Sequence, residues 1–127
     1  MSSFAYLSSG RFAGAAATPG KPFGLAGIAW DGSVTNRPGA RMGPRAIRSA
    51  SHMLCDGIHP FFDVSPVEQL GDALDMRLPN ASPLPEVRAQ IEAQAAALMA
   101  KHHCVFLGGD HSVTLSLLRA AKARHGE

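Results

Sequence analysis

The sequence predicts an α/β fold in which strands and helices alternate and the strands form a parallel sheet. Three observations carry this prediction. Apolar runs without polar alternation, typical of strands buried on both faces, occupy residues 23–30 and 104–107. Segments with apolar residues at helical spacing lie between and after these runs. Polar, glycine-containing clusters follow both runs directly, where parallel sheets usually bind their ligands.

Turn-forming and helix-starting residues mark the limits of the first elements. Asp31-Gly32 ends the first strand, and the loop after it is rich in glycine and proline. Pro44 suits the first position of a helix. In this helix we expect Arg45 and Arg48 to be able to face solvent. We expect a loosely ordered N-terminal arm over residues 1–22 and one domain over 23–127, with strands over 23–30, 67–74 and 104–107 and helices over 44–51, 85–101 and 113–124.

Among the later elements, the helices show a clearer apolar periodicity than the middle strand does. Gly71-Asp72 interrupts the pattern of that strand. The last strand, opened by Cys104, is expected to be buried, and the last two helices each carry one apolar stripe. The stripes consist of Val87, Ile91, Ala95 and Leu98 in the first of these helices and of Val113, Leu117 and Ala121 in the second.

Composition excludes several classes of protein. The chain has 127 residues, of which 46% are hydrophobic and 17% charged, so it is neither disordered nor long enough for two ordinary domains. A net charge of +2, with basic residues among glycines and prolines, gives no reason to expect nucleic acid as a partner. No apolar run approaches the roughly 20 residues of a bilayer span, and no signal peptide is visible, so we expect a cytoplasmic protein. Cys55 and Cys104 form neither a zinc motif nor a disulfide framework.

The cluster Gly108-Gly109-Asp110-His111-Ser112 is the strongest candidate for chemistry. Its glycines allow a sharp turn, and Asp110 and His111 then project near a helix start. A metal site and a purely structural turn both suit this pattern, because imidazole and carboxylate are ordinary metal ligands. A phosphate suits it less, because Asp110 would repel the anion and no lysine follows as in a P-loop.

The remaining histidines and acids favour structural interpretations. His102 and His103 are neighbours at a strand start, where successive side chains point to opposite faces, so they cannot easily chelate one ion. Asp72 and Asp75 fit a solvated strand end better than a metal pair. The other histidines, His52, His59 and His125, stand alone in the sequence.

Two motifs resemble one enzyme family. Residues 36–48, Asn-Arg-Pro-Gly-Ala-Arg-Met-Gly-Pro-Arg-Ala-Ile-Arg, resemble the signature loop of agmatinases, and residues 27–31 resemble the strand before it. Residues 108–112 resemble the first metal motif of the ureohydrolase superfamily, which contains arginases and agmatinases. The order and separation of the motifs match the family over nearly the whole chain, whereas a nucleotide-binding half-domain would need a G-x-G-x-x-G motif that the sequence lacks.

The resemblance implies a fold and a chemistry. The family has a three-layer α/β/α fold around an eight-stranded parallel sheet, with the first three strands in the order 2-1-3. Two Mn²⁺ ions share a bridging hydroxide that attacks a guanidinium carbon and releases urea. By this resemblance His111 is a manganese ligand, Asp110 orients the site from beside it, and Asn36 belongs to a loop at the entrance or at a subunit contact. A small guanidine substrate and a homo-oligomeric enzyme are likewise implied.

The later metal motifs of the family, Asp-Ala-His-x-Asp and Ser-x-Asp-x-Asp, do not occur in the sequence. We therefore expect the N-terminal part of an agmatinase-like hydrolase, with its first three strands, that is inactive by itself. The alternatives are a guanidinobutyrase or guanidinopropionase type of hydrolase, or a non-catalytic α/β fragment.

Overall fold

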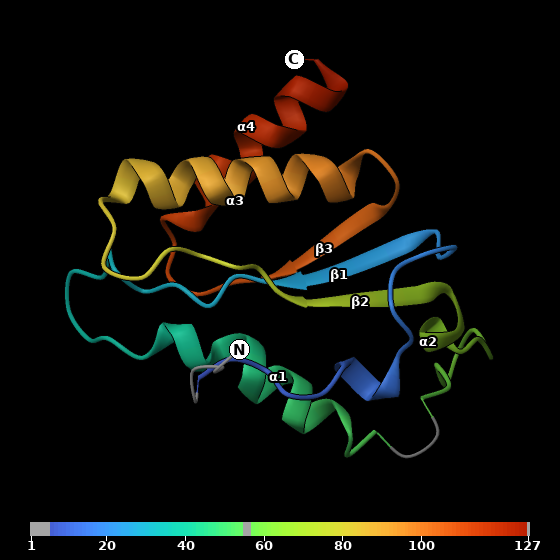
Figure 1. The fold of residues 1–127 in the computed structure, drawn as a ribbon. Helices are drawn as coiled ribbons and strands as arrows, with labels where there is room; N and C mark the ends of the chain where they lie inside the picture. Colours follow the sequence, from blue (N-terminus) through green and yellow to red (C-terminus); the bar gives the residue numbers. More distant parts are fainter. Residues whose placement is uncertain (1–5, 55–56, 127) are drawn as a thin grey trace.

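A computed structural model of the chain describes residues 6–54 and 57–126 and contains one parallel sheet (Figure 1). Its order is β2-β1-β3, which is the order that the family resemblance implied. The central strand pairs in parallel with both neighbours. The strands are β1 (Phe23–Gly27), β2 (Leu70–Asp75) and β3 (His103–Leu107).

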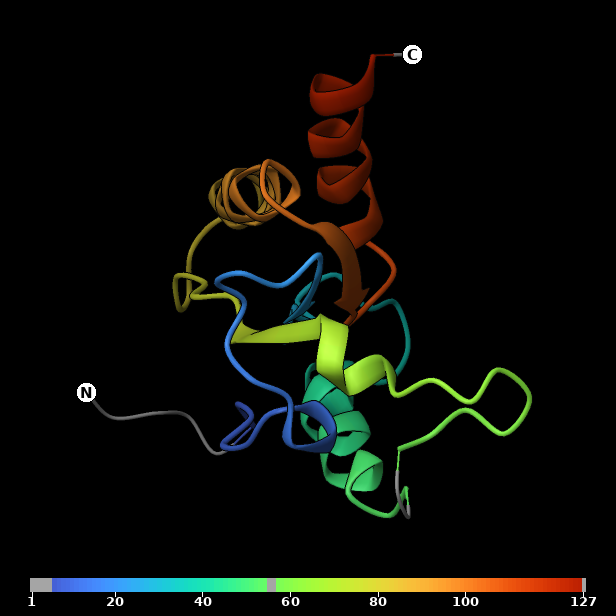
Figure 2. The same ribbon diagram turned by 90° about the vertical axis from the view of Figure 1, so that its right-hand side faces the viewer.

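Helices cover both faces of this sheet, so the predicted three-layer α/β/α fold is confirmed (Figure 2). One face carries α3 (Leu84–Met99) and α4 (Val113–His125), and the other carries α1 (Gly43–Ser51). Three short helical turns complete the structure, namely η1 (Phe12–Gly14), η2 (Ala40–Met42) and α2 (Pro66–Gln69). None of the helices in the described residues has the length and hydropathy that crossing a bilayer requires.

The core lies between the sheet and the helices α3 and α4. The predicted stripe of α3 is confirmed, because Val87, Ile91 and Ala95 are fully buried against Ala26 and Ile28 of the first strand region. In α4 the buried set is displaced from the predicted stripe. It consists of Val113, Ser116 and Ala120, with Leu117 partly buried.

Two strand predictions need correction. Gly71 and Asp72 do not interrupt the second strand, since both lie inside β2, which begins only after the turn α2. Glycine is required there because a Cβ on Gly71 would collide with the backbone of Thr18. The third strand is not buried, since Val105 is 49% exposed and β3 pairs only with β1 among the described residues.

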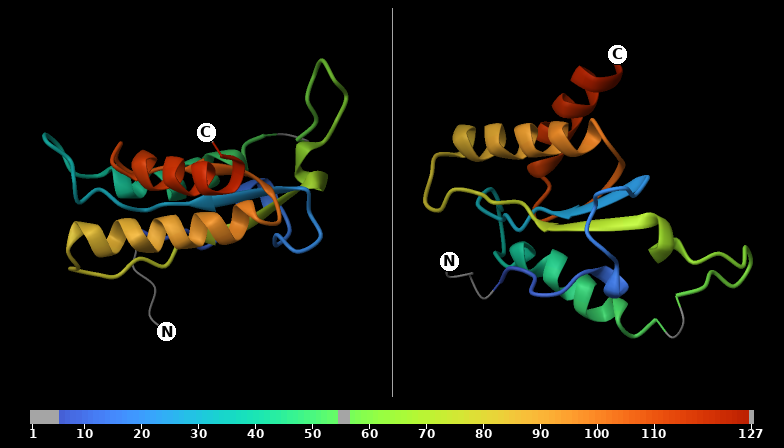
Figure 3. Two further views of the ribbon diagram at one scale, coloured as in Figure 1. Left: turned by 90° about the horizontal axis from the view of Figure 1, so that it is seen from above. Right: turned by 45° about the vertical axis from the view of Figure 1, so that its right-hand side comes forward.

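The N-terminal arm lies along β2 and α1 (Figure 3, right). Ala16 forms a bridge with Gly71, and the Asp72 amide donates to the Ala16 carbonyl oxygen over 2.8 Å. On the α1 side, the Ala13 amide donates to the Ser51 hydroxyl over 2.7 Å. The described part of the arm therefore covers one edge of the sheet.

The environment of Arg48 differs from two expectations about charged residues. Its side chain is 2% exposed and donates to both carboxylate oxygens of Asp72 over 2.8 Å and to Asp75. Arg48 therefore does not face solvent, and the two aspartates are neither a solvated strand end nor a metal pair. The helix α1 places this guanidinium under β2, where a buried charge requires such partners.

Candidate functional site

The two polar clusters predicted from the sequence meet at the carboxyl edge of the sheet. The Ile28 amide donates to the Leu107 carbonyl over 2.8 Å, and the Asp110 amide donates to the Trp30 carbonyl over 2.7 Å. These bonds continue the β1–β3 pairing beyond the strands. A Cβ on Gly109 would run into the backbone carbonyl of Trp30, so glycine is required for this approach.

Asp110 has a buried carboxylate whose two oxygens accept from different segments. Oδ1 accepts from the amide and the hydroxyl of Ser112, at 3.0 and 2.5 Å. Oδ2 accepts from the amide of Ser33 over 2.9 Å. Asp110 thus shapes the turn that carries His111 and joins it to the loop after β1.

His111 lies two residues before the first residue of α4, and its side chain is exposed. Its carbonyl accepts from the Thr114 amide over 3.2 Å, which holds the backbone of the turn and leaves the imidazole at the surface. Within the described part of the chain, no three His, Cys, Asp or Glu side chains gather closely enough to hold a metal ion together. Among the described residues, His111 is therefore not part of a set of three or more metal-ligating side chains.

Asp31 is the second buried carboxylate of the edge. Its Oδ2 accepts from the amides of Gly39 and Arg41, at 2.7 and 3.3 Å, and its Oδ1 accepts from the Arg41 guanidinium at 3.3 Å. Burial by itself raises the pKa of the Asp31 carboxyl, but these donors outweigh burial and hold that pKa below its ordinary value. Asn36, the loop candidate, lies exposed between the segments that Asp31 and Asp110 hold.

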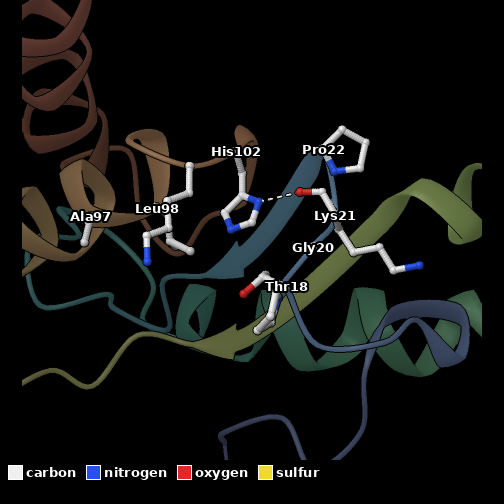
Figure 4. Close-up of a pocket in the computed structure, with 9 residues that line it drawn as sticks. Thr18, Gly20, Lys21, Pro22, Ala97, Leu98 and His102 are labelled. Atoms are coloured by element: carbon white, nitrogen blue, oxygen red, sulfur yellow. Dashed lines mark hydrogen bonds between the residues drawn. The ribbon is translucent and has the colours of Figure 1, made fainter.

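A cavity of about 730 Å³ lies at the opposite, amino end of the sheet (Figure 4). The ring Nδ1 of His102 lies 2.6 Å from the Lys21 carbonyl oxygen there, and because that oxygen only accepts, Nδ1 carries the proton. His103 instead packs edge-on against Phe23. The two histidines have separate partners, which agrees with the structural interpretation of both.

The two cysteines add nothing to this site. Burial raises the pKa of the Cys104 thiol, which is half-buried at the start of β3. Cys55 lies outside the described residues.

The sequence reasoning missed Ser33 and Arg41. Ser33 contributes only its amide to Asp110, 77 positions away, and any residue except proline has such an amide. A weak signal existed for Arg41, because an arginine ten residues after an acid, across a glycine-rich turn, can fold back on it.

Comparisons with known proteins extend these observations. A model of the arginase family matches residues 21–127. An agmatinase from Chromobacterium violaceum is 38% identical over 109 residues, which cover 81% of this chain and 33% of that protein. A guanidinopropionase from Pseudomonas aeruginosa is 35% identical over 105 residues, covering 76% of this chain and 31% of the relative. The chain thus spans about a third of the length of the curated relatives it matches.

A solved structure shows the same fold. The proclavaminate amidinohydrolase of Streptomyces clavuligerus superposes with a TM-score of 0.82 at 29% identity. The superposition covers 98% of this chain and 42% of that chain. The described sheet and its helices therefore correspond to part of a larger α/β fold.

Proposed function

The chain belongs to the arginase family, and on this premise we propose that it forms the N-terminal part of a metal-dependent guanidine hydrolase. One observation carries the proposal. The turn 108–112 presents His111, exposed, at the carboxyl edge of the parallel sheet, and Gly43 of the segment that resembles the agmatinase signature lies against the Gly108 carbonyl of this turn. Sites in such sheets form at this edge.

Manganese is the metal that the family resemblance implies, and His111 is the residue of this chain that would hold it. Asp110 accepts hydrogen bonds from the amides of Ser33 and Ser112 and from the Ser112 hydroxyl, which suits a residue that orients the turn beside the metal. A pair of divalent ions needs several carboxylates to balance its charge. The described residues do not fit a complete two-metal centre, so the other ligands have to come from elsewhere in the enzyme.

Agmatine is the substrate that we propose, with water as the second reactant and putrescine and urea as products. The loop over residues 36–48 and the similarity to the Chromobacterium violaceum agmatinase support this choice. The similarity to the Pseudomonas aeruginosa guanidinopropionase favours a second candidate, a hydrolase of guanidino acids. By itself the chain should release no urea, because one histidine cannot bind a metal pair.

A hybrid enzyme tests the proposal. Residues 21–127 would replace the matching third of the Chromobacterium violaceum agmatinase, with folding checked by circular dichroism. We expect urea release from agmatine in the presence of Mn²⁺. His111→Ala should reduce this rate by at least about 100-fold and lower the bound manganese by about one ion per chain.

The matched control is His103→Ala, which removes an exposed histidine at the other end of the same strand region. It should change neither the rate nor the metal content. A folded hybrid whose metal content and rate are insensitive to His111→Ala would contradict the assignment. A comparison of agmatine with 3-guanidinopropionate as substrates of a longer protein that contains this chain would separate the two substrate candidates.

A further inference from the structure

The loop between β1 and α1 is attached at both ends to the turn that carries His111. We define residues 33–42 as the rim loop. At its start, the Ser33 amide donates to Asp110 Oδ2 over 2.9 Å. At its end, Gly43 lies so close to the same turn that a Cβ there would sit 3.0 Å from the Gly108 carbonyl oxygen. The rim loop therefore leaves and rejoins the sheet within three residues of His111.

Two buried carboxylates hold the rim loop in this position. Asp31 and Asp110 are each 8% exposed, and both use their oxygens on backbone amides of the loop. Hydrogen bonds from N–H groups to a carboxylate are about twice as strong as those between neutral groups. Buried charges of this kind fix the backbone of a segment that has only the short turn η2 as secondary structure.

The middle of the rim loop is solvent-exposed, from Thr35 to Gly39. Gly39 has a φ of 130°, a conformation that side chains rarely adopt, which lets the chain turn back toward Asp31. In Figure 1 the loop extends from the carboxyl end of β1, beyond the sheet. The middle of the rim loop is thus exposed, while the amides of Ser33 and Arg41 on either side of it are hydrogen-bonded to Asp110 and Asp31.

We propose that the rim loop forms one wall of the substrate site and that Asp31 and Asp110 are the positioning residues that fix this wall. The inference rests on the proposed function, since the substrate is the guanidine compound hydrolysed there. Neither carboxylate touches the substrate. They act through the backbone of the loop, so their loss should weaken substrate binding more than the chemical step.

Amide hydrogen exchange on the chain tests the anchoring without any assay of activity. Asp110→Ala should accelerate exchange at the Ser33 amide by about 10- to 100-fold, and Asp31→Ala should do the same at the Gly39 amide. Asp31→Asn keeps one acceptor oxygen and should restore part of the protection. The amide of Ile28 in the core serves as the internal reference for global unfolding.

Two matched controls remove a side-chain group and leave the proposed anchors in place. Ser112→Ala deletes the hydroxyl bonded to Asp110 and should leave the Ser33 amide protected. Arg41→Ala deletes the guanidinium bonded to Asp31 and should leave the Gly39 amide protected. Equal acceleration in a control and in its aspartate variant would overturn the anchoring.

Kinetics in the hybrid enzyme test the role of the wall. Asp31→Ala should raise KM for agmatine by about tenfold, with kcat changed by less than about threefold, and Asp31→Asn should recover part of the loss. A loss of kcat at constant KM, or faster loop exchange with unchanged kinetics, would overturn the proposal. An inactive but folded hybrid would count against the proposed function alone, and the exchange experiment would then decide whether the two aspartates position the loop.

Discussion

The two edges of the sheet are completed in different ways. At the β2 edge, the N-terminal arm adds the Ala16–Gly71 bridge and hydrogen bonds to the strand backbone. At the β3 edge, Val105 is 49% exposed, and Leu118 of the neighbouring helix α4 is 62% exposed. The chain thus stabilises the first edge with its own residues, whereas the second edge presents backbone and apolar side chains to whatever packs beside it.

Buried charges, rather than apolar contacts alone, hold the arm at the β2 edge. Arg48 donates to the Ser8 hydroxyl, and the Ser8 amide donates to Asp75, over 2.8 and 2.7 Å. The Phe12 amide donates to Asp72, which is fully buried. The arm, α1 and β2 therefore share one network, and removal of its cation would leave two carboxylates without their counter-ion.

Replacement of Arg48 should have the largest effect on this edge. Arg48→Met keeps much of the side-chain volume but leaves the buried Asp72 without its positive partner, which typically costs about 3–5 kcal/mol. We expect the free energy of unfolding in urea to fall by that amount and the amides of residues 8–16 to lose their protection from exchange. Arg45→Met, on the exposed side of the same helix, should change stability by less than about 0.5 kcal/mol. Similar stability of the two variants would contradict the role of the network.

Low pH should destabilise the β2 edge, because it protonates the Asp72 carboxylate. Burial by itself raises the pKa of Asp72, but the Arg48 guanidinium and the amides of Phe12 and Leu74 outweigh it, so the pKa in the folded state is below the ordinary value. The stabilisation is therefore complete above the unfolded pKa of about 4 and declines as the pH falls through the folded pKa. Chemical unfolding between pH 7 and pH 2 measures this slope.

Asp72→Asn should flatten the acid slope, and it should also lower stability at neutral pH because the ion pair is lost. Asp63→Asn is the matched control, since Asp63 is exposed in the loop before α2. An acid slope that survives unchanged in Asp72→Asn would mean that other carboxyl groups cause it.

Features that depend on local sequence were predictable, whereas features that depend on contacts between distant segments were not. The helices α3 and α4, the strand β1 and the position of His111 follow from periodicity and motif, which are local properties. The buried state of Arg48 was not predictable, because it depends on two aspartates 24 and 27 positions later that β2 brings above α1. The contact between Asp110 and the Ser33 amide depends in the same way on strand order.

The apolar sequence of β3, Cys-Val-Phe-Leu, predicts a buried strand, whereas the strand order 2-1-3 implied by the family resemblance predicts an open edge for these three strands, and the structure has the open edge. A sequence of this kind suits a strand with neighbours on both sides. Among the described residues, β3 has a neighbour on one side only. The sequence of the strand reflects a more complete sheet than these residues form.

The smallest change in stability, with a distinct effect on association, is expected at this second edge. Val105 is half-exposed, so Val105→Lys should alter the free energy of unfolding by less than about 0.5 kcal/mol. A lysine on an open edge opposes pairing with another strand, because its charge cannot be buried there.

We expect the isolated chain to elute from size-exclusion columns above its monomer mass of 13.3 kDa, and Val105→Lys to shift it toward the monomer. A lysine at the covered β2 edge would displace the arm, so Thr114→Lys, exposed on α4, serves as the charge control. If the unmodified chain is a soluble monomer with one cooperative thermal transition, the three strands form an autonomous unit and the open edge is not an association site.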